Sequence, residues 1–223
     1  YIFYCIIYNE EHRLRKWRKL SMKILMFDTE TTGLRPGQIC QLSYIVIDNS
    51  TKPYKVYGKN FFFSVDYMEE SAEQIHGFSK ELLEELSGGM TFEESYHEFI
   101  EDFMTSDIIS GHNVMFDIKF IKEEFRRVGI EFTPNLEFCT MKYYKNICNI
   151  ISRQGDIKNP KLSELMDFLD ISEEDIEKTT MKLFGDTRSF HDARFDTTAV
   201  YMSLVDGIRK GYIPPKYFSS MCK

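Results

Sequence analysis

Short apolar runs in the first part of the chain have the length and spacing of buried strands. One run covers 23–27, and two longer runs at 38–48 and 54–65 follow each other across a short polar stretch that contains Pro53. Strands that are joined by such turns usually pair as antiparallel neighbours. The pattern therefore predicts a three-stranded meander at the start of the domain.

Helical periodicity dominates the rest of the chain and is interrupted by two further short apolar runs. These runs predict strands at 108–110 and 135–138. The periodic segments predict helices at 69–75, 80–86, 91–104, 115–128, 140–151, 161–169, 172–183 and 192–209. Thr91 and Glu94 have the spacing of a capping box, and Gly129 is a natural helix stop. A meander followed by alternating strands and helices predicts an α/β fold, with a mixed five-stranded sheet flanked by helices.

Two acidic residues follow the first apolar run. Asp28 and Glu30 stand two positions apart in the segment FDTETTGL. Residues i and i+2 of a strand point to the same face, so both carboxylates enter one space. Two such anions repel each other unless a cation lies between them or one carboxylate takes up a proton. The pair therefore predicts a metal site.

Two more acidic residues occupy helix positions that face inward. Asp117 precedes Phe120 and Ile121 by one helical turn, and Asp196 has the same relation to Ala199. Acidic side chains are rarely buried without a partner. We therefore expect Asp117 and Asp196 to serve the same metal site as the first pair.

The segment before the last helix contains a histidine and a further aspartate. His191 and Asp196 are five positions apart, which on a continuous helix would place them roughly 140° apart. We therefore expect His191 on the loop that precedes the helix. Asp192 is well placed as the N-cap of that helix, and a role as a second metal ligand is the less favoured alternative.

Three motifs of the chain together resemble those of a known enzyme family. In order and spacing, FDTETTGL, GHNVMFD and HDARFD are similar to the motifs of the DnaQ-like (DEDDh) 3'-5' exonucleases, over a span of about 22–205. The resemblance implies a ribonuclease H-like fold and identifies His191 as the general base. It identifies these metal ligands: Asp28, Glu30, Asp117 and Asp196.

The same resemblance implies a substrate cleft beside the acidic pair. Backbone amides around Thr29 and Thr31 would bind the terminal nucleotide, and Leu34 would wedge against its base. His76 lies in the segment QIHGF, which resembles the family's Ile-His-Gly segment. A buried, hydrogen-bonded histidine is the favoured interpretation of His76, with a place along the substrate cleft as the alternative.

The charge of the four carboxylates indicates which cofactor to expect. If they converge, their negative charges match a pair of divalent cations, and hard oxygen ligands favour Mg²⁺ or Mn²⁺. Two such ions about 3.5 to 4 Å apart stabilise the attacking and leaving oxygens of phosphodiester cleavage. An imidazole can accept the proton of the attacking water near neutral pH. The family resemblance implies that the reaction removes nucleoside 5'-monophosphates from the 3' end of DNA, at single strands or frayed ends.

Composition limits the class of protein further. With 223 residues the chain is long enough for one well-buried core, so we expect an exonuclease domain at 22–223 and an extension of uncertain status at 1–21. The apolar opening of the extension is too short to cross a membrane. Five cysteines without a Cys-x-x-Cys spacing predict the reduced thiols of a cytoplasmic protein. A net charge of −7 argues against a protein that coats long nucleic acid.

Three alternatives stay open at this point. An exonuclease that acts mainly on RNA or short oligonucleotides would carry the same acidic motifs, because recognition of the 2'-hydroxyl depends on the shape of the cleft. A non-catalytic nucleic-acid-binding module of the same fold should have lost a carboxylate or the histidine, and none is missing here. A role in proofreading or repair would add a DNA polymerase as a partner.

Overall fold

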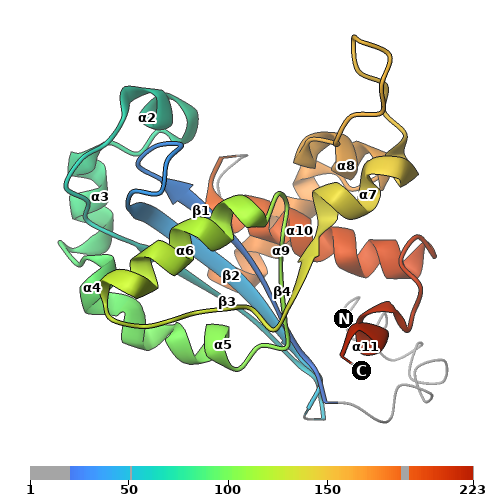
Figure 1. The fold of residues 1–223 in the computed structure, drawn as a ribbon, viewed down its shortest axis with the longest axis horizontal. Coiled ribbons are helices and arrows are strands. Elements are labelled where there is room, and N and C mark those ends of the chain that lie inside the picture. The colour runs from blue at the N-terminus through green and yellow to red at the C-terminus, as the bar shows by residue number, and fades with distance from the viewer. Residues whose placement is uncertain (1–20, 51, 187–190, 223) are drawn as a thin grey trace.

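A mixed sheet of five strands forms the centre of the structure (Figure 1). The computed structural model describes residues 21–50, 52–186 and 191–222, so the expected extension lies outside it except for its last residue. The strands are β1 (Lys23–Thr31), β2 (Ile39–Asp48), β3 (Lys55–Phe62), β4 (Ile108–Gly111) and β5 (Leu136–Cys139). Their order is β3-β2-β1-β4-β5, with β1, β2 and β3 antiparallel and with β4 and β5 parallel to β1. The predicted meander and the mixed five-stranded sheet are both confirmed.

Helices cover both faces of this sheet. They are α2 (Glu70–His76), α3 (Lys80–Ser87), α4 (Phe92–Ser95), α5 (Ile100–Met104), α6 (Met115–Arg127), α7 (Thr140–Cys148), α8 (Leu162–Phe168), α9 (Glu173–Phe184), α10 (Ala193–Arg209) and α11 (Tyr217–Met221), with a 3₁₀ turn η1 (Tyr96–Glu98). Figure 1 shows α6 and α10 on opposite sides of β1. None of the helices in the described ranges is long and apolar enough to cross a membrane.

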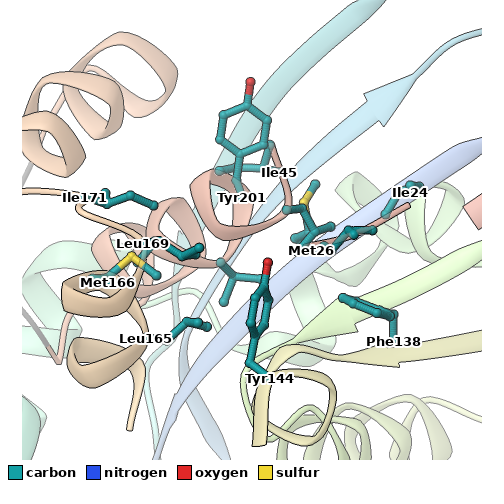
Figure 2. Close-up of a cluster of buried hydrophobic side chains, with 14 of the residues drawn as sticks. Ile24, Met26, Ile45, Phe138, Tyr144, Leu165, Met166, Leu169, Ile171 and Tyr201 are labelled. Atoms are coloured by element: carbon teal, nitrogen blue, oxygen red, sulfur yellow. The ribbon is translucent and has the colours of Figure 1, made fainter. Parts of the chain in front are cut away.

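Alternation of side chains along β1 divides the core into two layers. Leu25 and Phe27 pack with α5 and α6, whereas Ile24 and Met26 pack with α7, α8 and α10. Figure 2 shows the second layer, where Met26 lies among side chains of β2, α7, α8 and α10. A residue at an even position of β1 therefore faces α10, and a residue at an odd position faces α6.

Several predicted boundaries were wrong, including that of the third strand, which was expected to reach 65 and ends at Phe62. The first strand continues past Phe27 to Thr31, because β2 pairs with it over that length. The helix expected at 91–104 breaks near Phe99 into α4, η1 and α5, which lets Asp102 accept hydrogen bonds from the hydroxyl groups of Tyr44 and Tyr57. The helix expected at 140–151 ends at Cys148, because Asn149 adopts a left-handed conformation that stops it.

Removal of a central ring from the α6-side layer should destabilise the protein. The ring of Phe103 makes edge contacts with the rings of Phe27, Tyr44 and Phe125, and its side chain is 1% exposed. We expect Phe103→Ala to lower the free energy of unfolding by about 3 to 5 kcal/mol, measured by urea denaturation. Tyr54→Ala, at a side chain that is 40% exposed, is the control and should change it by less than about 0.5 kcal/mol. A loss below about 1 kcal/mol for Phe103→Ala would contradict the layer assignment.

Candidate active site

The acidic pair lies on a part of β1 that has a neighbouring strand on one side only. Beyond Met26, which pairs with Ser110, β1 has no further partner in β4, while β2 continues to pair with it. Asp28 and Glu30 occupy even positions and therefore face α10. The end of β4 thus leaves room beside the acidic pair for side chains from the following segment.

The third carboxylate comes from the first turn of α10. Carboxylate oxygens of Asp28, Glu30 and Asp196 all lie within 4.8 Å of one another. Among the residues that the structure describes, this is the only group of three or more acidic, histidine or cysteine side chains with such spacing. Three of the four predicted metal ligands therefore come together from two distant segments.

Asp117 lies next to this group, on the side of α6. Its side chain is 3% exposed, and its Oδ1 accepts hydrogen bonds from the backbone N–H of Thr29 at 3.1 Å and from the Thr29 hydroxyl at 2.8 Å. Because β4 no longer pairs with β1 at this point, Asp117 provides the hydrogen-bond acceptor for the backbone N–H of Thr29. The negative charge of Asp117 also raises the pKa of Asp28, after the larger effect of burial. The fourth predicted ligand therefore borders the same site.

Burial and mutual repulsion both disfavour ionisation of these carboxylates. Burial raises the pKa of Asp28 and Glu30 well above their ordinary values, and the neighbouring carboxylates raise it further. Burial raises the pKa of Asp117 to about 7, although hydrogen bonds from Thr29 oppose the shift. Burial likewise raises the pKa of Asp196 to about 7. Perturbed carboxylates that are clustered in this way are typical of functional sites.

The donor set fits a divalent cation. Every group in the cluster offers carboxylate oxygen, the ligand type that Mg²⁺ and Mn²⁺ prefer. Oδ1 of Asp196 is buried and has no hydrogen-bond partner among the described residues, so its lone pairs are available to an ion. A buried acceptor without a partner is costly, and a bound cation would remove that cost.

His191 lies at the border of the site, directly before α10. His191 is exposed, and its backbone has a left-handed φ of 67°. Its backbone N–H points to Oδ2 of Asp196 at 3.4 Å. The predicted position on a loop before the helix is therefore confirmed. The role of His191 as a base stays a prediction.

The residues predicted to bind substrate have different surroundings. Leu34 is 78% exposed, as a side chain that contacts a ligand must be, whereas the Thr31 hydroxyl donates to the Gly33 carbonyl at 2.9 Å. The hydroxyl of Thr29 is held by Asp117. Nδ1 of His76 accepts from the N–H of Phe78 at 3.0 Å, which leaves Nε2–H to face the Thr31 carbonyl at 3.4 Å. His76 is hydrogen-bonded as predicted, but it is half-buried rather than buried. The substrate contacts of all four residues stay predictions.

Two neighbours of the site, Gln41 and Arg194, were not expected from the sequence, and both bind Asp192. Asp192 caps α10 as predicted, since its carboxylate accepts from the N–H of Arg194 at 3.0 Å. The same carboxylate is also bound by the side chains of Gln41 and Arg194, so the alternative role as a metal ligand is not supported. A charged residue among the buried positions of HDARFD was the available signal for Arg194. Gln41 had none, because strand glutamines are common.

Comparisons with known proteins show the family to which the chain belongs. The RNase_T family model, described as an exonuclease, matches residues 25–201. The epsilon subunit of DNA polymerase III from Rickettsia felis is 36% identical over 110 residues, which cover 47% of this chain and 44% of that protein. The PolC-type DNA polymerase III of Bacillus cereus is 25% identical over 215 residues, 93% of this chain and 13% of that protein. The chain therefore belongs to the DnaQ-like exonuclease family, and it spans less than half the length of these two relatives.

Solved structures of exonuclease I share the fold. The enzyme from Methylocaldum szegediense has a TM-score of 0.65 with 16% identity, over 88% of this chain and 42% of that chain. Exonuclease I of E. coli, in complex with an oligonucleotide, has a TM-score of 0.62 with 16% identity, over 85% of this chain and 40% of that chain. The predicted ribonuclease H-like fold is thus confirmed.

Stabilisation by metal should depend on pH. The pKa values of Asp117 and Asp196 are about 7 in the folded protein, above the value of about 3.9 of an unfolded aspartate. The stability that they contribute is therefore present below about pH 4 and is lost as pH rises through 7. A bound cation opposes this loss and competes with protons at lower pH, so Mn²⁺ should raise the melting temperature more at pH 8 than at pH 6.

Thermal unfolding followed by circular dichroism checks this expectation. Asp196→Asn should reduce both the Mn²⁺ shift and its pH dependence. Asp156→Asn, at an exposed carboxylate of a distant turn, should leave both unchanged. Equal shifts at the two pH values in the native protein would contradict a site that is made of these carboxylates.

Proposed function

We propose that this protein is a metal-dependent 3'-5' exonuclease that removes nucleoside 5'-monophosphates from single-stranded or frayed 3' ends of DNA. The observation that carries the proposal is the convergence of Asp28, Glu30 and Asp196 within 4.8 Å, in a chain that the exonuclease family model matches over 25–201. The hydrogen-bonded position of Asp117 beside them supports a four-carboxylate site.

Each of the clustered side chains has a defined part in the proposed reaction. Asp28, Glu30, Asp117 and Asp196 would hold a pair of Mg²⁺ or Mn²⁺ ions, which when bound supply charge stabilisation to the attacking and leaving oxygens. His191 accepts the proton of the attacking water, because its backbone lies beside Asp196 and its side chain is open to solvent. The buried side of the site excludes water from the carboxylates and thereby strengthens their interactions.

Residues on the loop beside the carboxylates would select the end of a strand. Leu34 stands on the loop that follows β1, where its exposed side chain can wedge against the last base. The backbone around Thr31 and the ring of His76 border the same loop, and they would contact the terminal nucleotide. DNA is the proposed substrate because the curated relatives are named as DNA polymerase III subunits or polymerases.

The same names support a place beside a DNA polymerase. Proofreading needs a 3'-5' exonuclease that removes mismatched ends, and such ends are frayed. A polymerase partner would also offset the acidic net charge of −7, which disfavours tight independent binding to nucleic acid. We therefore propose proofreading as the pathway, with repair as the alternative.

A degradation assay tests the proposed activity. We expect 5'-labelled single-stranded DNA to shorten from its 3' end only when Mg²⁺ or Mn²⁺ is present. Asp28→Asn keeps the size of the side chain but removes a charged ligand, which costs several kcal/mol of transition-state stabilisation and thus roughly a thousandfold in rate.

The controls separate the alternatives. Asp66→Asn, at an exposed carboxylate, should retain the rate of the native protein. An RNA strand of the same sequence should be cut more slowly than DNA. Faster cutting of RNA would show that RNA, and not DNA, is the preferred substrate. DNA that stays intact with either ion would contradict the proposed exonuclease activity and would favour a non-catalytic binding module.

A further inference from the structure

A buried arginine occupies the first turn of α10. Arg194 is 5% exposed and stands between the N-cap Asp192 and the predicted ligand Asp196. Its Nε and Nη2 donate to the two carboxylate oxygens of Asp192 at 2.9 and 2.8 Å. Its Nη1 donates to Asp186 at 2.7 Å, and its guanidinium lies 5.6 Å from the centre of the Phe62 ring. One guanidinium thus binds two carboxylates and stacks on an aromatic side chain.

Only one of these two carboxylates belongs to a direct chain neighbour of His191. Asp186 follows the end of α9, and Asp192 directly follows His191 in the chain. Oδ1 of Asp192 is bound in addition by the side chain of Gln41 at 3.1 Å, and the carbonyl oxygen of that amide accepts from the N–H of Ala193 at 3.1 Å. The first turn of α10 is therefore fixed to β2, the strand that pairs with the acidic segment of β1.

The geometry of this contact limits which residue can make it. A planar guanidinium matches a carboxylate with two parallel hydrogen bonds, and such charge-assisted pairs fix orientation as well as distance. A lysine at the same position would keep the charge but would lose the paired geometry. The site therefore uses a property of arginine that charge alone does not provide.

We propose that Arg194 is a positioning residue for His191. By binding Asp192, which directly follows His191, and joining it to Asp186 beyond the end of α9, Arg194 fixes the backbone where α10 begins, so that the imidazole meets the attacking water beside Asp196. Arg194 itself does not touch the reacting atoms. This inference rests on the proposed function, because it assigns a support to the general base of that reaction.

Kinetics of three variants test the assignment. A base that is displaced by about 1 Å can lose up to about a hundredfold in rate, so Arg194→Lys should lower kcat by about 10- to 100-fold with little change in KM. Asp186→Asn removes the more exposed anchor only and should cause a smaller loss of kcat in the same direction. Arg209→Lys is the matched control, because it changes an exposed ion pair at the far end of the same helix and should leave kcat unchanged.

The decisive comparison places the substitutions in a His191→Ala background. If Arg194 acts through His191, then Arg194→Lys should cause no further loss of kcat once the histidine is absent. If Arg194→Lys lowers kcat in the His191→Ala background by the same factor as in the native protein, the proposal is overturned. Native kcat in both Arg194→Lys and Asp186→Asn would overturn it as well. Asp186→Asn keeps the test decisive if Arg194→Lys fails to fold.

A second measurement does not depend on activity. Amide hydrogen exchange at 191–192 should be faster in Arg194→Lys and in Asp186→Asn than in the native protein, while the affinity for Mn²⁺ stays the same. Unchanged exchange in both variants would overturn the positioning role. If the native protein degrades no nucleic acid, the proposed function fails, yet the exchange rates still decide whether Arg194 fixes this segment.

Discussion

Repulsion among buried carboxylates is the constraint on which the rest of this structure depends. The cluster concentrates negative charge where burial and mutual repulsion raise the pKa values of its members. A folded protein tolerates such a cluster only if protons or cations compensate the charge. Around neutral pH a cation does so at the smaller cost, because the ligands are all hard oxygen donors. The demand for metal is therefore built into the fold.

The fold creates this cluster through the unequal lengths of its strands. β4 ends at Gly111, and β1 continues beyond it to Thr31 with a free edge. At that edge, Oδ1 of Asp117 accepts a hydrogen bond from the backbone N–H of Thr29. On the opposite face, the contact between Gln41 and Asp192 sets the start of α10, and with it the position of Asp196. Both faces of the sheet thus contribute to one site at the end of one strand.

The sequence predicted the carboxylates because each of them violated a local rule. Asp28 and Glu30 share a strand face, and Asp117 and Asp196 occupy helix positions that the pattern predicts to face inward, so each required an explanation that solvent exposure could not supply. The contact of Arg194 with Asp186 had no such local signal, because it depends on where α9 ends relative to α10. The break near Phe99 was missed for a similar reason, since Asp102 is held by tyrosines of distant strands. Local sequence patterns identified the carboxylates of the site, whereas the residues that hold the surrounding segments in place depend on tertiary contacts.

A crystal structure with Mn²⁺, recorded with its anomalous scattering, tests the central claim most directly. The account predicts anomalous peaks between the carboxylates of Asp28, Glu30 and Asp196, with one ion also within reach of Asp117, at the distances of about 2 to 2.2 Å that such ligands adopt. A folded protein in which these oxygens bind no Mn²⁺, or in which the only peaks lie elsewhere, would contradict it.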